Sequence, residues 1–207
     1  MGVGTSVFRK IWKANPDGEG NRLESVLVRK GWGSTPLSSA NEVKSIKEKK
    51  DMEFKKFGGP KVDLVTYVGN YCHTHRNIQI MVSTDSQCDK GLTTFATIVA
   101  MYDCGDGEHG HGAHVIFRSW KTRNYKKSEI FERMMAETMA SIDVAKLLRD
   151  SGIFVKYVDI DISPDEENGS NVAFSAAKGW VESEGFECRW KTLCPLSTTT
   201  ADKIARR

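Results

Sequence analysis

Residues 77–87, NIQIMVSTDSQ, contain an apolar run that only Gln79 interrupts. A short apolar run of this kind, without alternation between apolar and polar residues, is typical of a strand buried on both faces. Such a strand lies in the interior of a sheet and not at its edge. The rest of the chain is therefore expected to supply strands on both sides of it and helices that cover the sheet.

The segments that follow residue 87 supply these neighbours. Two β-rich runs at 93–103 and 113–123 are joined by short loops, which predicts an antiparallel meander of three strands. Right-handed crossovers then place a fourth strand, 153–163, beside the first and parallel to it. The sequence therefore predicts an α/β fold with a five-stranded mixed sheet in the order 3-2-1-4-5, flanked by helices. The remaining predicted elements are a fifth strand at 186–193 and helices at 62–71, 128–149, 171–184 and 197–207.

The helix ends carry their own signals. Ser128 is the expected N-cap of the long second helix, because its hydroxyl can accept a hydrogen bond from a free backbone N–H. Ser197, or one of the threonines that follow it, is the expected cap of the last helix.

Residues 1–60 differ from the rest in charge and organisation. They hold 12 Lys and Arg against 7 Asp and Glu, a balance of +5, so residues 61–207 must carry −2 of the total charge of +3. Turn-forming residues break up the first 40 positions, and 41–57 fits either a short polar helix or a linker. We predict a basic, weakly organised extension over 1–60 and a folded domain over 61–207. The basic charge suits a phosphate partner, but a solvated lysine-rich linker has the same composition.

Composition excludes several classes of protein. The 207 residues are 39% hydrophobic and 28% charged, which is typical of a soluble globular chain. No apolar run approaches the roughly 18 residues that a membrane span needs, so we expect no membrane partner. The five cysteines show no CxxC pair, and the first residues lack the apolar core of a secretory signal. We expect reduced thiols and a cytoplasmic location, whereas the oligomeric state is left open.

Acidic side chains fall at the places where such a fold would bring them together. Asp85 and Asp161 lie near the carboxyl ends of the two central, parallel strands, where α/β sheets place their sites. Asp159 shares a face with Asp161, so either could point toward the site. Glu137 lies on the apolar stripe of the long helix, where an ionised carboxylate is unfavourable unless it is paired or bound to a metal. Asp202 lies on the last helix.

A cluster of carboxylates without a cation would repel itself. Ligands that are all oxygen suit a hard cation, Mg²⁺ or Mn²⁺. Two such ions can clamp a phosphodiester for in-line hydrolysis. The alternative is that each acid only caps a turn or forms an ion pair.

Several short motifs carry a family resemblance. STDSQ at 83–87, AET at 136–138, DIDISPD at 159–165 and TTADKIARR at 199–207 resemble the YkuK-type family of RNase H-like nucleases, within the ribonuclease H-like superfamily. The resemblance covers roughly 61–207. It implies an RNase H-like sheet and metal ligands on the first strand, the first long helix, the end of the fourth strand and the last helix. By position, these ligands are Asp85, Glu137, Asp161 and Asp202, with two Mg²⁺ or Mn²⁺ ions as cofactors and Asp159 as the possible substitute for Asp161.

A basic segment leads from the third strand toward the long helix. Trp120 and Tyr125 are interleaved with its cations, a combination that suits a phosphate backbone and unstacked bases. A solvated strand end with two core aromatics is the alternative. Its basic residues are Arg118, Lys121, Arg123, Lys126 and Lys127.

Together these features predict a metal-dependent nuclease that hydrolyses RNA, RNA/DNA hybrid or DNA. The alternative is a non-catalytic nucleic-acid-binding module that keeps the same fold.

Overall fold

The structure is a computed structural model that describes residues 7–14, 21–28, 52–105, 112–123 and 125–206. Side chains are described from residue 52 onward, with the exception of Lys127 and residues 195–198. Strands β1 (Val7–Ala14) and β2 (Asn21–Val28) pair as an antiparallel two-stranded sheet. Among the described residues, none of the helices combines the length and the apolar character that crossing a bilayer requires.

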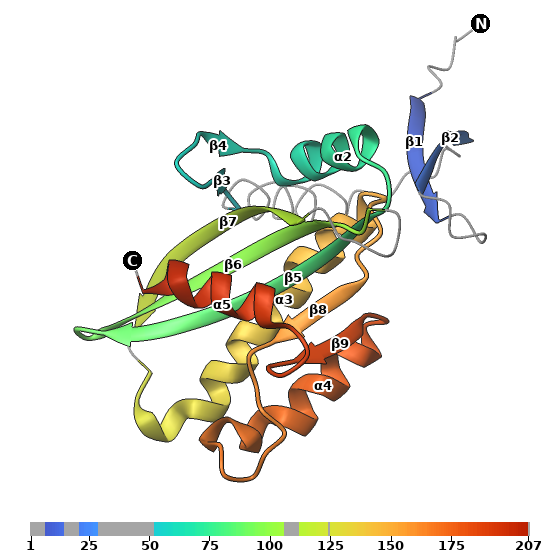
Figure 1. Cartoon of the computed structure of the whole chain (residues 1–207). Coiled ribbons are helices and arrows are strands. Elements are labelled where there is room, and N and C mark those ends of the chain that lie inside the picture. The colour runs from blue at the N-terminus through green and yellow to red at the C-terminus, as the bar shows by residue number, and fades with distance from the viewer. Residues whose placement is uncertain (1–6, 15–20, 29–51, 106–111, 124, 207) are drawn as a thin grey trace, which may run out of the picture.

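The main sheet has seven strands in the order β4-β3-β7-β6-β5-β8-β9 (Figure 1). The predicted five-stranded order 3-2-1-4-5 is confirmed, since it corresponds to β7-β6-β5-β8-β9. Strand β5 is antiparallel to β6 and parallel to β8, and β8 is parallel to β9. The long strands are β5 (Ile78–Asp89), β6 (Leu92–Asp103) and β7 (Gly112–Arg123), and the short ones are β3 (Phe54–Lys56), β4 (Lys61–Val62), β8 (Tyr157–Ile160) and β9 (Glu187–Trp190).

A two-residue turn sets the register of the central hairpin. Lys90 has φ 46° and Gly91 has φ 81°, and Asp89 pairs with Leu92 on either side of them. Positive φ at both central residues gives the turn a twist that matches the twist of the flanking strands. Because side chains alternate along a strand, this register decides which face of the sheet each β5 side chain occupies.

Helices cover both faces of the sheet. On one face, α2 (Leu64–Thr74), α3 (Ile130–Asp150) and α4 (Phe174–Ser183) pack over the larger apolar core, which contains Ile80, Val82 and Leu148. On the other face, α5 (Pro195–Ala205) packs Ala201 and Ile204 over a smaller cluster. Figure 1 shows α5 in front of the sheet and α3 behind it. We call these the α3 face and the α5 face.

The structure differs from the prediction at several element ends. Residues 54–56 form β3, which was expected to be helix or linker, and Phe54 is fully buried in the core. The main sheet thus begins before residue 61, and the division into two domains stays a prediction. Ser128 lies inside a 3₁₀ turn, η1 (Lys127–Glu129), and Glu129 precedes α3. The last helix begins at Pro195 after Cys194. Proline suits the first helical position because it has no N–H, and an N–H there would lack an acceptor within the helix. A second 3₁₀ turn, η2 (Gly169–Ala173), precedes α4.

Candidate active site

Asp85 and Asp161 are neighbours across the two central strands. The last registered pair between β5 and β8 is Thr84 with Ile160, and Asp85 and Asp161 come one residue beyond it on their chains. Adjacent strands lie about 4.8 Å apart, so the two acids are close together at the carboxyl ends of the strands. Asp85 is only 8% exposed. The predicted meeting of these two strand ends is thus present.

Glu137 of α3 reaches the same end of β5. Its side chain is 3% exposed, as its position on the apolar stripe predicted. Ser86 connects it to Asp85: the Ser86 hydroxyl donates to Glu137 Oε1 at 2.5 Å, and the Ser86 backbone N–H donates to Asp85 Oδ1 at 2.7 Å. A single serine therefore orients both carboxyl groups.

Hydroxyl groups fix α3 against the sheet just behind Glu137. Ser141 Oγ donates to Thr84 Oγ1 at 2.9 Å, and Thr84 Oγ1 shares a 2.8 Å hydrogen bond with Thr97 Oγ1 of β6. All three side chains are buried. Buried polar groups that are satisfied in this way hold one arrangement of the elements that carry them.

Burial and mutual repulsion raise the pKa of both buried acids. The pKa of Asp85 is raised to about 7, chiefly by burial and then by the charges of Asp161 and Asp202. Burial likewise raises the pKa of Glu137 well above its usual value, and Asp85 and Asp161 add to it. The N–H and O–H groups of Ser86 and the charge of Arg133 act in the opposite direction. Each of the four predicted acids thus interacts electrostatically with at least one of the others.

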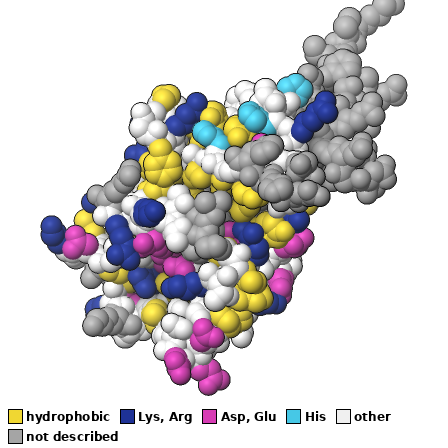
Figure 2. All heavy atoms as spheres, viewed as in Figure 1, with side chains coloured by type: hydrophobic (Ala, Val, Ile, Leu, Met, Phe, Trp, Pro, Cys, Tyr) yellow, Lys and Arg dark blue, Asp and Glu magenta, His cyan; other side chains and the backbone are white. Residues whose placement is uncertain are grey.

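Basic side chains pair with the two more exposed acids. Arg206 Nε donates to Asp202 Oδ1 at 2.6 Å, and the pKa of Arg206 is raised by Asp202 and then by Asp85. Lys191 Nζ lies 3.7 Å from Asp161 Oδ1, which is beyond hydrogen-bonding distance. Figure 2 shows acidic side chains bordered by Lys and Arg side chains on the face that α5 covers.

The donor set fits a hard divalent cation. All four acids offer oxygen, the ligand that Mg²⁺ and Mn²⁺ prefer. Asp161 Oδ1 is buried and has no hydrogen-bond partner in the described part of the chain, so it is an acceptor that a cation would satisfy. In the structure as it stands, no group of three or more His, Cys, Asp or Glu side chains among the described residues is arranged to hold a metal ion.

Asp159 shares the α5 face with Asp161 but has another partner. Arg189 of β9 donates from Nε to Asp159 Oδ1 at 2.8 Å and from its terminal nitrogen to Oδ2 at 2.7 Å. The Asp159 side chain is fully buried in this ion pair. Between the two candidates, the electrostatic contacts with Asp85 and Glu137 come from Asp161.

The basic segment of β7 divides between the two faces. Arg118 lies opposite Thr97 of β6, which in turn lies opposite Thr84 of β5, so its side chain is on the α3 face. Its guanidinium stacks 4.3 Å over Trp120. Lys121 lies opposite Thr94 of β6, which lies opposite Gln87 of β5. Gln87 is two residues beyond Asp85, so Lys121 is on the same face of the sheet as Asp85.

The rest of the segment lies beyond or at the end of β7. Arg123 stacks 4.5 Å over Tyr125 and forms a 3.0 Å ion pair with Glu129. The Lys126 side chain is exposed, and the Lys127 side chain lies outside the described part of the chain.

Sequence reasoning missed four residues that border the acids. Ser86 directly follows Asp85, so its backbone N–H is close enough to donate a hydrogen bond to the Asp85 carboxyl group. Arg133 and Arg206 lie four residues from Glu137 and Asp202, the spacing at which helical side chains meet. These signals were present in the sequence, whereas Lys191 could be found only from the tertiary structure.

Two comparisons with known proteins return a match. A family model described as ribonuclease H-like matches residues 63–206. Among solved structures, the chain is similar to the N-terminal RNase H domain of a Mycobacterium tuberculosis protein, solved as a fusion with maltose-binding protein. That match has 10% identity and a TM-score of 0.28, and it covers 63% of this chain and 98% of that one. A search of curated proteins returns no match.

Proposed function

Because the chain belongs to the ribonuclease H-like family, we propose that it is a metal-dependent nuclease that hydrolyses phosphodiester bonds. The observation that supports this most directly is the raised pKa of two buried carboxyl groups, Asp85 and Glu137, next to two further acids. Strongly perturbed pKa values cluster at functional sites. Without a cation this cluster is unfavourable, so its side chains suit the binding of one.

Asp85, Glu137, Asp161 and Asp202 would hold the cations, two Mg²⁺ or Mn²⁺ ions by our proposal. When bound, such ions help to activate the attacking water and stabilise the leaving oxygen. The raised pKa values of Asp85 and Glu137 mean that both carboxyl groups bind a proton more tightly than usual, and a bound cation would favour their ionised forms instead. Ser86 would keep both carboxyl groups oriented during this exchange, because its backbone N–H donates to Asp85 and its hydroxyl donates to Glu137.

Basic residues around the acids would contact the substrate. Lys191 and Arg206 neutralise Asp161 and Asp202 in the structure. Cations bound to those acids would free both side chains for a phosphate group. Lys121 is exposed on the α5 face, in the row of Gln87, two residues beyond Asp85, and it would contact the nucleic-acid strand on one side of the site.

The proposed substrate is RNA, RNA/DNA hybrid or DNA. Membership of the narrower YkuK-type family and a cytoplasmic location also remain proposals. The motifs that support the narrower family include the segments of Asp85, Glu137, Asp161 and Asp202.

One observation favours the alternative of a non-catalytic nucleic-acid-binding module. Asp161 and Asp202 already have basic partners, and the described residues show no preformed group of metal ligands. A chain of this kind would use Lys121 and its neighbours to hold a phosphate backbone and would not cut it.

Cleavage of end-labelled RNA, DNA and hybrid substrates separates the two proposals. We expect the wild type to cut at least one substrate with Mg²⁺ or Mn²⁺ and none in EDTA. Asp85→Asn should lower the cleavage rate more than about 100-fold. Loss of a residue that only supports a metal ligand typically lowers activity by about 10–100-fold, so a larger loss indicates a ligand. Asp89→Asn, an exposed acid at the end of the same strand, is the matched control and should cut normally. Salt-sensitive binding without any cleavage would instead establish the binding module.

A further inference from the structure

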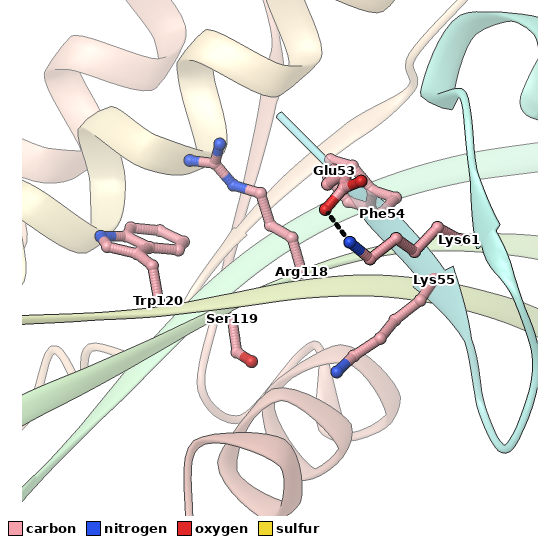
Figure 3. A pocket seen from close by; sticks show the side chains of 7 residues that line it. All are labelled: Glu53, Phe54, Lys55, Lys61, Arg118, Ser119 and Trp120. Atoms are coloured by element: carbon pink, nitrogen blue, oxygen red, sulfur yellow. Dashed lines mark ion pairs between the residues drawn. The ribbon is translucent and has the colours of Figure 1, made fainter. Parts of the chain in front are cut away.

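A pocket of about 520 Å³ lies at the edge of the main sheet, where β3 ends beside β7. Strand β3 pairs with β7 only at Phe117 and Ile116, so the following residues of β7 have no partner strand on that side among the described residues. Figure 3 shows Arg118 and Trp120 on one side of β7 and Ser119 and Lys55 on the other. The pocket therefore wraps around the open edge of the sheet.

Arg118 is more buried than is usual for an arginine at the surface, and one of its donors lacks an acceptor among the described residues. Burial lowers its pKa, and the exposed Asp143 of α3 offsets that effect only in part. Its guanidinium is oriented by the stacking contact with Trp120. Its Nε is buried and has no acceptor among the described residues. A buried donor without an acceptor is unfavourable, and an anion at this point would satisfy it.

The other charges that line the pocket also favour an anion. Lys55 and Lys61 contribute two cations, and Glu53, the only acid among the described residues that line the pocket, is paired with Lys61 at 2.6 Å. A guanidinium can bind a phosphate through two parallel hydrogen bonds, which makes arginine the usual partner of that group. The volume is also in the range of pockets that hold small ligands or parts of larger ones.

We propose that this pocket is a second nucleic-acid contact, in which Arg118, Lys55 and Lys61 bind a backbone phosphate outside the carboxylate cluster. The proposal rests on nucleic acid being the partner, as in the proposed function. A nucleic-acid strand is favoured over a free phosphate, because the basic side chains of the pocket continue into Lys121 and Arg123 along β7. Ser119, in its wall, lies two strand spacings from Asp85, or about 10 Å. At about 3.4 Å per nucleotide, a strand covers this separation in about three nucleotides.

Anisotropy of a labelled oligonucleotide in EDTA tests the pocket without cleavage. Arg118→Gln should weaken binding about tenfold, the value of a charge-assisted hydrogen bond. The slope of log affinity against log salt should fall by about 0.7 for a single strand, the share of one phosphate. Arg118→Lys should keep the slope and lose part of the affinity.

Two further variants keep the test independent of folding. Lys61→Gln changes an exposed side chain and should also weaken binding. Lys178→Gln, on α4, removes a cation that is paired with Glu182 and should bind like the wild type. Urea midpoints of all variants show whether each is folded under the binding conditions.

The outcomes separate the pocket from the proposed nuclease activity. If Arg118→Gln and Lys61→Gln bind like Lys178→Gln, the pocket proposal is wrong, even if the wild type cuts nucleic acid. If Arg118→Gln abolishes the binding of inorganic phosphate or a mononucleotide but leaves the affinity for the oligonucleotide unchanged, the ligand is a free phosphate and the backbone assignment is wrong. If no substrate is cut but affinity still depends on Arg118, the nuclease proposal fails and the pocket stands.

Discussion

Replacing Asp85 by asparagine should make the protein more stable at alkaline pH in the absence of a divalent cation. The pKa of Asp85 rises from its ordinary 3.8 to about 7 on folding, chiefly through burial and then through Asp161. Because the folded pKa is the higher one, the native state binds a proton more tightly than the unfolded state. The unfavourable effect of the charge is therefore absent below about pH 4 and grows until the pH passes about 7.

The magnitude follows from that rise. At about 1.4 kcal/mol per pKa unit, a rise of about three units corresponds to about 4 kcal/mol at pH 8. Asparagine keeps the shape and can still accept the Ser86 N–H, so it removes the charge and little else. The wild type should thus lose stability between pH 4 and 8, and Asp85→Asn should lose much less.

Urea unfolding across pH 4–9 in EDTA measures this difference. Stability is taken from the midpoint at constant slope, which guards against a change in the unfolded state. Asp89→Asn is again the control. Added Mg²⁺ should stabilise the wild type by mass action and leave Asp85→Asn unchanged. Parallel pH profiles for the wild type and Asp85→Asn would refute the argument that burial and repulsion act on this carboxyl group.

Three further substitutions test other parts of the structure. Glu137→Gln can still accept the Ser86 hydroxyl, so it should raise the melting temperature at pH 8 in EDTA and abolish cleavage; an unchanged melting temperature would contradict the strongly raised pKa. Arg189→Met removes the bidentate partner of the buried Asp159 and should cost about 3 kcal/mol or more in urea unfolding, and a loss below about 1 kcal/mol would show that the pair is dispensable. Leu148→Ala, fully buried in the larger core, should cost about 2–5 kcal/mol by the same measurement, and a smaller loss would mean that the core closes around the cavity.

The sequence predicted the parts of the fold that local patterns determine. The apolar run of β5 indicated an interior strand, and the position of Glu137 on an apolar helical stripe indicated a buried acid. Both follow from periodicity, which needs no knowledge of distant residues. Strand β3 escaped prediction because three residues, two of them lysine, carry no periodic signal.

The fate of Asp159 and Asp161 shows why the rest of the site could not be predicted. Alternation places both acids on one face, and nothing local distinguishes them. The difference comes from Arg189, which lies on β9 and reaches Asp159 but not Asp161. The basic segment of β7 is a different case, since strand alternation, which is readable from the sequence, sends Arg118 and Lys121 to opposite faces.

The turn at Lys90 and Gly91 makes the carboxylate cluster sensitive to insertions that the core would tolerate. Strand β5 is apolar on both faces, with Met81 in one cluster and Val82 in the other, so hydrophobic burial alone discriminates weakly between neighbouring registers. One added residue that slipped the pairing by one position would exchange the faces of Asp85 and Ser86. Such a variant would keep a buried sheet and lose the cluster.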